Sequence, residues 1–209
     1  MLKIFSQMIF NKNKFLKKLD HHYLELNVVG RDYLFFLKSN WMVSRFAVEK
    51  LSFGIRFSWV VFPLFDWSKN ISLSYSGPIE SPFRLIEIKD KSIKEVLDLS
   101  IQLIDENYSF VKNKANIDSL LEYFRGRESQ LHRVSERRRA YAIALATKHY
   151  DKEAFKQFEL ATNEAQESQK DLKILKDDCS ELSCLLKQDR NLFLERIQVE
   201  CDETYDAVF

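Results

Sequence analysis

Between Leu51 and Val61, apolar side chains recur at every second position. They stand at six successive odd positions, namely Leu51, Phe53, Ile55, Phe57, Trp59 and Val61. A period of two places this set on one face of a long β-strand. Pro63 ends the strand, because proline cannot donate a hydrogen bond to a β-ladder. The fold must therefore cover one apolar sheet face with other elements.

Further strands are predicted on both sides of this segment. Tyr33–Leu37 is short, aromatic and apolar, and Ile71, Leu73 and Tyr75 alternate with serines. Segment 63–70 would join the two best strands as a loose hairpin. Gly77-Pro78 predicts a turn, and Phe83–Ile88 predicts one more strand. Phe46 and Val48 alternate with their neighbours in the same way. Together these patterns predict an antiparallel meander.

An amphipathic helix is predicted before the sheet. Its apolar positions are Phe10, Phe15, Leu16 and Leu19, and its lysines are Lys12, Lys14, Lys17 and Lys18. Such a helix either packs on the sheet or lies on an anionic membrane surface.

After Asp90 the apolar period becomes helical. A first helix is marked by Ile93, Val96, Leu97, Ile101 and Ile104. A second carries the stripe Ile117, Leu120, Leu121 and Phe124, with Asn116 as its N-cap and Gly126 at its end. Neither glycine nor proline occurs after Gly126, so long helices are predicted to the C-terminus. One carries the seam Leu172, Leu175, Cys179, Leu182 and Leu186, and the last, from about Arg190, would bury Phe193, Ile197 and Cys201.

The predicted fold class is therefore α+β: an N-terminal helix and antiparallel sheet, followed by an all-helical C-terminal part. Residues 1–90 carry 13 basic and 8 acidic side chains, whereas residues 91–209 carry 19 and 23. This asymmetry predicts a sheet domain over 1–90 and a helical domain over 91–209, or one continuous domain. The net charge of +1 excludes a wholesale polycation but not a local basic patch.

No motif for a cofactor, a metal or a catalytic nucleophile occurs in the sequence. The four glycines are isolated, so they form no phosphate-binding loop. Three cysteines do not make a secreted disulfide framework, and we expect small buried thiols in a helical core. The longest near-apolar run, Phe57–Phe65, is too short to span a membrane, and the first ten residues lack the features of a signal peptide. We expect a cytoplasmic protein that is not an enzyme and needs no cofactor.

Arginines crowd the segment from Arg125 to Arg139. The cluster comprises Arg125, Arg127, Arg133, Arg137, Arg138 and Arg139, and Glu128 and Glu136 interrupt it. On a helix Arg133 and Arg137 share one face, while Arg138 and Arg139 turn away from it. Three interpretations remain open: a solvated face or internal salt bridges, contact with an acidic protein, or contact with nucleic acid.

Aromatic residues also fall in predicted loops. Phe65, Asp66 and Trp67 lie between the two best strands, and Trp41 lies in another loop. Exposed aromatic side chains anchor protein interfaces, although a loop aromatic also folds back onto its own core. The predicted partner-binding residues are Trp41, Phe65, Asp66, Trp67, Arg133, Arg137 and Arg138.

Two resemblances follow from these patterns. Small and aromatic residues in Ala140–Ala146 and Tyr150–Ala161 are spaced as in a tetratricopeptide repeat, which implies one helical hairpin. In texture and element order, the chain resembles bacterial immunity-type proteins. That resemblance implies a non-enzymatic protein that binds another protein and neutralises a cognate toxin by occlusion. The alternatives are a nucleic-acid-binding regulator that uses the arginine-rich helix, and an enzyme whose site is assembled from scattered loops.

Overall fold

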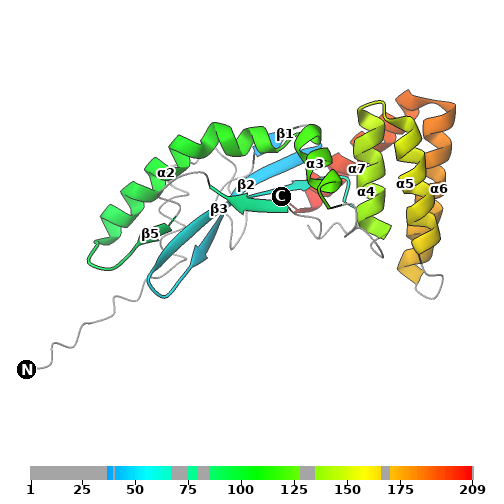
Figure 1. Cartoon of the computed structure of the whole chain (residues 1–209). Helices are drawn as coiled ribbons and strands as arrows, with labels where there is room; N and C mark the ends of the chain where they lie inside the picture. Colours follow the sequence, from blue (N-terminus) through cyan, green and yellow to red (C-terminus); the bar gives the residue numbers. More distant parts are fainter. Residues whose placement is uncertain are drawn as a thin grey trace, which may run out of the picture. The chain divides into compact units, whose positions relative to one another are not determined.

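The protein has an α+β fold in which an antiparallel sheet precedes six helices of the described part of the chain (Figure 1). The computed structural model describes residues 37–39, 41–66, 75–79, 85–127, 135–165 and 170–208. The strands are β1 (Leu37–Ser39), β2 (Met42–Lys50), β3 (Gly54–Pro63), β4 (Tyr75–Pro78) and β5 (Leu85–Glu87). The helices are α2 (Ile93–Lys114), α3 (Ile117–Arg125), α4 (Ser135–Thr147), α5 (Asp151–Glu164), α6 (Lys170–Gln188) and α7 (Arg190–Val208). The helix predicted around Phe10–Leu19 lies outside the described residues.

The predicted meander is confirmed for the first four strands, which follow the order β1-β2-β3-β4. β1 and β2 are antiparallel, with Leu37 opposite Ser44. β5 does not extend the meander beyond β4. It pairs antiparallel with the start of β3, where Gly54 lies opposite Glu87. The first half of β3 therefore has β5 as a neighbour, and this crossover gives no local sequence signal.

The predicted strand over 51–61 is correct in type but begins later. Leu51 donates its backbone N–H to the carbonyl of Gly54 at 2.8 Å, which closes a tight turn before β3. Phe53, which was predicted to face the core, is 53% exposed in that turn. Burial alternates from Ile55 to Phe57 as predicted, but every residue from Val60 to Pro63 is buried. Other elements therefore cover both faces of the second half of β3.

The turn predicted at Gly77-Pro78 is wrong, because both residues belong to β4. Proline is tolerated there since β4 is the last strand in the sheet order, where a missing ladder donor costs little. Gly77 is needed for space. A Cβ at this position would lie 2.6 Å from the ring of Trp59. The glycine therefore marks a close approach of an aromatic ring, not a chain reversal.

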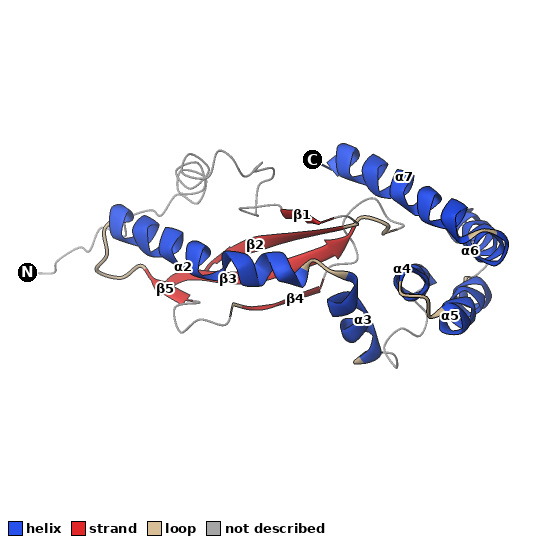
Figure 2. Cartoon of the chain, turned by 90° about the horizontal axis from the view of Figure 1, so that it is seen from above, coloured by secondary structure: helices blue, strands red, loops and turns tan. Residues whose placement is uncertain are grey.

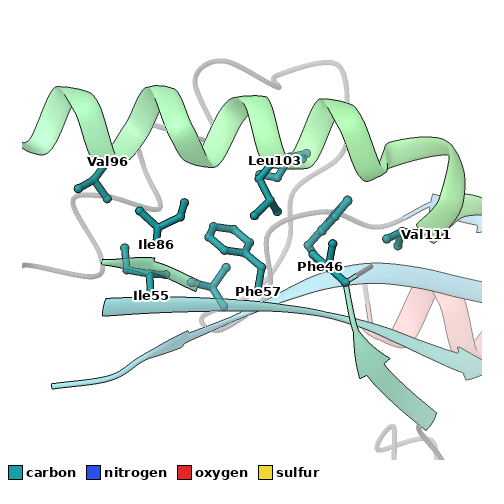
Figure 3. Close-up of a cluster of buried hydrophobic side chains, with 10 residues drawn as sticks. Phe46, Ile55, Phe57, Ile86, Val96, Leu103 and Val111 are labelled. Carbon is teal, nitrogen blue, oxygen red and sulfur yellow. The ribbon is translucent and has the colours of Figure 1, made fainter. Parts of the chain in front are cut away.

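The chain forms two compact units, each of which gathers distant segments. In the first, which includes residues 45–59 and the described residues of 77–111, α2 lies along the strands (Figure 2). Its apolar face packs onto β2, β3 and β5 (Figure 3). The buried cluster comprises Phe46, Val48, Ile55, Phe57, Ile79, Ile86, Val96, Leu103, Ile104 and Val111. α2 thus lies in one unit with the strands, whereas the predicted division at residue 90 stays a prediction.

The second unit includes residues 37–44, the described residues of 60–76 and those of 112–209. Each helix from α3 to α7 packs against the next one along the chain, and α4 also contacts α6. The predicted hairpin of 140–161 is present as α4 and α5. The seam on α6 is buried from Leu175 to Leu186, and α7 begins at Arg190 and buries Phe193, Ile197 and Cys201 as predicted.

Candidate binding site at the α4–α5 turn

The predicted loop aromatics are held by their own unit. Trp41 lies in the turn between β1 and β2, and its ring Nε1 donates to Oε1 of Gln198 at 2.6 Å. The backbone carbonyl of Trp41 accepts a hydrogen bond from Leu64. Phe65 is fully buried and Asp66 is 3% exposed, so neither offers its side chain to a partner in this structure. The alternative that a loop aromatic folds back onto the core is the one observed for Phe65. Trp67 lies outside the described residues.

The arginine cluster is divided between surface and interior. Arg137 is exposed, whereas Arg138 and Arg139 are buried in α4. Arg138 donates from Nε to Oε2 of Glu164 at 2.7 Å and from Nη1 to Oε1 of Gln157 at 2.9 Å, both on α5. Arg133 lies outside the described residues. For Arg138 and Arg139 the internal salt bridges are observed. Of these two, Arg138 was a predicted partner-binding residue, and its side chain is buried.

Arg139 joins four segments of the second unit. Its guanidinium donates to Oδ2 of Asp178 at 2.6 Å, to Oε2 of Glu200 at 2.7 Å and to the carbonyl of Phe65 at 2.8 Å. Burial alone lowers the pKa of Arg139, but the charges and hydrogen bonds of Glu200 and Asp178 outweigh it, so that its pKa lies above the ordinary value. Arg196 approaches both carboxylates at 3.6 Å. This buried ion network joins α4 to α6, to α7 and to the turn that follows β3.

In contrast to the buried arginines of α4, the turn between α4 and α5 is exposed. Its three residues, Lys148, His149 and Tyr150, are all exposed, and Tyr150 is 43% exposed. Tyr150 donates its backbone N–H to the carbonyl of Leu145 at 3.0 Å, and His149 donates to Ala146 at 3.1 Å. These two bonds form a Schellman motif, in which the residue at the position of His149 adopts the left-handed conformation and is usually glycine.

His149 is a strained residue at this turn. Its φ is +62°, in the left-handed region, where a non-glycine residue costs roughly 1–2 kcal/mol. Nothing in the backbone requires a side chain here, because glycine satisfies the same motif without strain. Strain of this kind persists where the surrounding structure holds it, and it clusters at functional sites. Asp90 has the same φ of +62°, so the left-handed conformation by itself assigns no role. His149 differs in that its exposed side chain belongs to a turn that neighbouring helices hold in place.

Neighbouring helices hold the turn in place. Nζ of Lys148 lies 2.6 Å from Oδ2 of Asp118 on α3. The guanidinium of Arg125, near the end of α3, lies 5.4 Å from the ring centre of Tyr150. Arg190 of α7 donates hydrogen bonds to the carbonyl of Ala146 at the end of α4 and to the carboxylate of Asp151 at the start of α5. We call Arg125, Lys148, His149 and Tyr150 the turn surface.

A second cation–aromatic pair lies at the end of α3, where Arg127 stands over the ring of Tyr123 at 4.3 Å. The arginines of both pairs, Arg125 and Arg127, lie at or just after the C-terminal end of α3, so the position of this end places them. The side chain of Asn116 accepts from the backbone of Ser119 and caps the N-terminus as predicted, and Gly126 follows the last helical residue as predicted. Gly126 has φ −67°, however, so its role is not that of a left-handed cap.

Sequence patterns gave no sign of the turn surface. Because residues 148–150 contain neither glycine nor proline, no turn chemistry distinguished them from the helices on either side. Two contacts between distant positions reveal that α3 and the turn form one surface: Arg125 lies over the ring of Tyr150, and Lys148 pairs with Asp118. Arg125 was part of the predicted cluster, whereas His149 and Tyr150 were not predicted as site residues.

A separate groove lies in the first unit between β5 and α2, with a volume of about 360 Å³. Its apolar lining comes from Leu85, Ile86, Leu99 and Leu103, and its polar lining from Glu87, Lys91, Gln102 and Glu106. Gln102 donates to Glu106 at 2.8 Å, so these two polar groups bond to each other.

Compared with known proteins, the chain matches no family model, no curated protein and no solved structure. Within the described ranges, no helix is both long and apolar enough to cross a membrane. The same ranges hold no group of three or more histidine, cysteine or acidic side chains suited to a metal ion. All three cysteines are free thiols: Cys179 and Cys201 are buried as expected, whereas Cys184 is exposed.

Proposed function

We propose that this protein binds another protein and neutralises it by occlusion, as an immunity or antagonist protein does, without catalysing a reaction. The observation that carries the proposal is the exposed, left-handed His149 in a turn that α3 and α7 hold in place. A rigid surface loses little entropy when it binds. Tyr150 follows His149 and lies against Arg125, and tyrosine and arginine are among the residue types most enriched at the centres of protein interfaces.

The nucleic-acid alternative is weakened by the burial of Arg138 and Arg139. A protein that binds a polyanion needs several exposed cations along one face, because each neutralised phosphate contributes through counterion release. Two adjacent arginines of the cluster are already neutralised by carboxylates of α5, α6 and α7. We therefore place the partner contact at the turn surface and not on the α4 arginines.

The proposal is tested by site-specific photo-cross-linking of the full chain in its native host. A benzophenone amino acid replaces Tyr150 in one variant and Glu159, exposed in the middle of α5, in a matched control. We expect an ultraviolet-dependent product of defined mass from position 150 that is absent from position 159. A product that forms equally from both positions, or from neither, would contradict a specific contact at the turn.

Neutralisation is then measured with the captured protein. Co-expression of the chain should restore growth of cells that the captured protein inhibits, and the purified pair should associate with a nanomolar dissociation constant. Products of neighbouring genes are the first candidates to test. A captured protein that is not toxic, and whose activity is unchanged when the chain is bound, would refute occlusion while leaving protein binding intact.

A further inference from the structure

The charge of the turn surface indicates the chemistry of what it binds. The ammonium of Lys148 is already paired with Asp118, and the guanidinium of Arg190 is paired with Asp151. Arg125 is exposed, and its contact in the described part of the chain is with the ring of Tyr150, not with a carboxylate. The charges within each of these two ion pairs cancel. Among the four residues of the turn surface, Arg125 therefore carries the positive charge that no carboxylate of the described residues neutralises.

From this charge balance we propose that the turn surface binds a single carboxylate of an acidic segment in the partner protein, with Arg125 as the residue that contacts it. This inference rests on the proposed protein-binding function. A guanidinium held against an aromatic ring is limited in its motion, and its N–H groups point outward from the rim of its own plane. That fork matches the two oxygens of a carboxylate, and such bidentate pairs are stronger and more directional than contacts with a point charge.

A carboxylate fits this site better than a run of phosphates. Asp118 and Asp151 already neutralise Lys148 and Arg190, and the carboxylate of Glu153 is exposed in the first turn of α5. One unpaired cation on the turn surface suits one anionic group, whereas a nucleic-acid backbone brings a charge with every phosphate and needs several exposed cations. In the same turn surface, His149 offers an imidazole that can hydrogen-bond, and Tyr150 offers an apolar ring.

The test is a titration of the ¹⁵N-labelled full chain, followed by amide chemical shifts. The probes are a short glutamate-containing peptide, its glutamine-substituted counterpart and a short single-stranded DNA. We expect the glutamate peptide to shift the amides of Arg125, His149 and Tyr150 in a saturable way, and the glutamine peptide to leave them unchanged. Arg125→Gln should weaken the glutamate peptide about tenfold, which corresponds to one lost charge-assisted contact.

Arg56→Gln is the control, because Arg56 is an exposed arginine on β3 that belongs to no predicted binding site, and the affinity should not change. The same spectra show whether each variant is folded. The inference is overturned if the glutamate peptide shifts no amide of the turn surface, or if DNA shifts them equally or more strongly. It is distinguishable from the proposed function: cross-linking at Tyr150 without any peptide response refutes the carboxylate and leaves protein binding standing.

Discussion

Replacing Arg139 by alanine should cost more stability than any other single substitution in α4. The guanidinium is fully buried and neutralises Asp178 and Glu200, which are themselves only 9% and 7% exposed. Arg139→Ala would leave these two carboxylates and the carbonyl of Phe65 without their shared donor. Removing one partner of a buried ion pair costs about 3–5 kcal/mol, because the remaining charge stays desolvated.

That loss is a large part of the 5–15 kcal/mol that typically separates folded from unfolded domains. We therefore expect Arg139→Ala to unfold at a much lower urea concentration, measured by far-ultraviolet circular dichroism at neutral pH. Arg137→Ala, on the exposed face of the same helix, should change the free energy of unfolding by less than about 0.5 kcal/mol. Arg139→Lys should fall in between, since an ammonium keeps the charge but cannot reach three acceptors in a plane.

A triple variant separates charge from packing. Arg139→Met with Asp178→Leu and Glu200→Leu removes the whole network and replaces it with apolar volume. Such replacements are often neutral or stabilising, so this variant should be more stable than Arg139→Ala. The reasoning would be refuted if Arg139→Ala lost less than about 1 kcal/mol, because the carboxylates would then have found water or another cation.

Four further outcomes follow from single residues. His149→Gly should raise the free energy of unfolding, measured in urea, by about 0.5 kcal/mol, because relief of the left-handed strain exceeds the cost of the added backbone entropy. The same variant should bind the partner more weakly. A less stable variant would show that the φ of +62° is not strained. Cys184 alone should react rapidly with a thiol reagent in the folded protein, and a second fast thiol would contradict the described burial. Burial raises the pKa of the Cys179 thiol to about 12, so the unfolded chain releases this proton first as pH rises above about 9. Between about pH 8 and 10 the free energy of unfolding should therefore fall by about 1.4 kcal/mol more in the natural protein than in Cys179→Ala. Equal decreases in the two proteins would refute the raised pKa. Asn116→Ala should lower the free energy of unfolding by about 1 kcal/mol because it removes the N-cap of α3. Asn116→Asp should keep most of that stability, because aspartate also caps helices, and thermal unfolding measures both variants.

The periodicity of apolar residues was sufficient to predict a helix or strand wherever one face of the element is apolar and the other is polar. It identified the first half of β3, the stripe on α3 with its Asn116 cap, the seam of α6 and the start of α7 at Arg190. These features depend on neighbours within one or two turns of chain, which is the range that a sequence pattern records. The α+β order of strands and helices follows from the same information.

Contacts between distant segments decided the rest. Nothing near Arg139 distinguishes it from exposed Arg137, because its carboxylates stand 39 and 61 positions away in the sequence. The close approach of Trp59 to Gly77 depends in the same way on surroundings that no local pattern encodes. A sequence shows that a charge exists, but only the tertiary structure decides whether a carboxylate neutralises it inside the protein or solvent leaves it available to a partner.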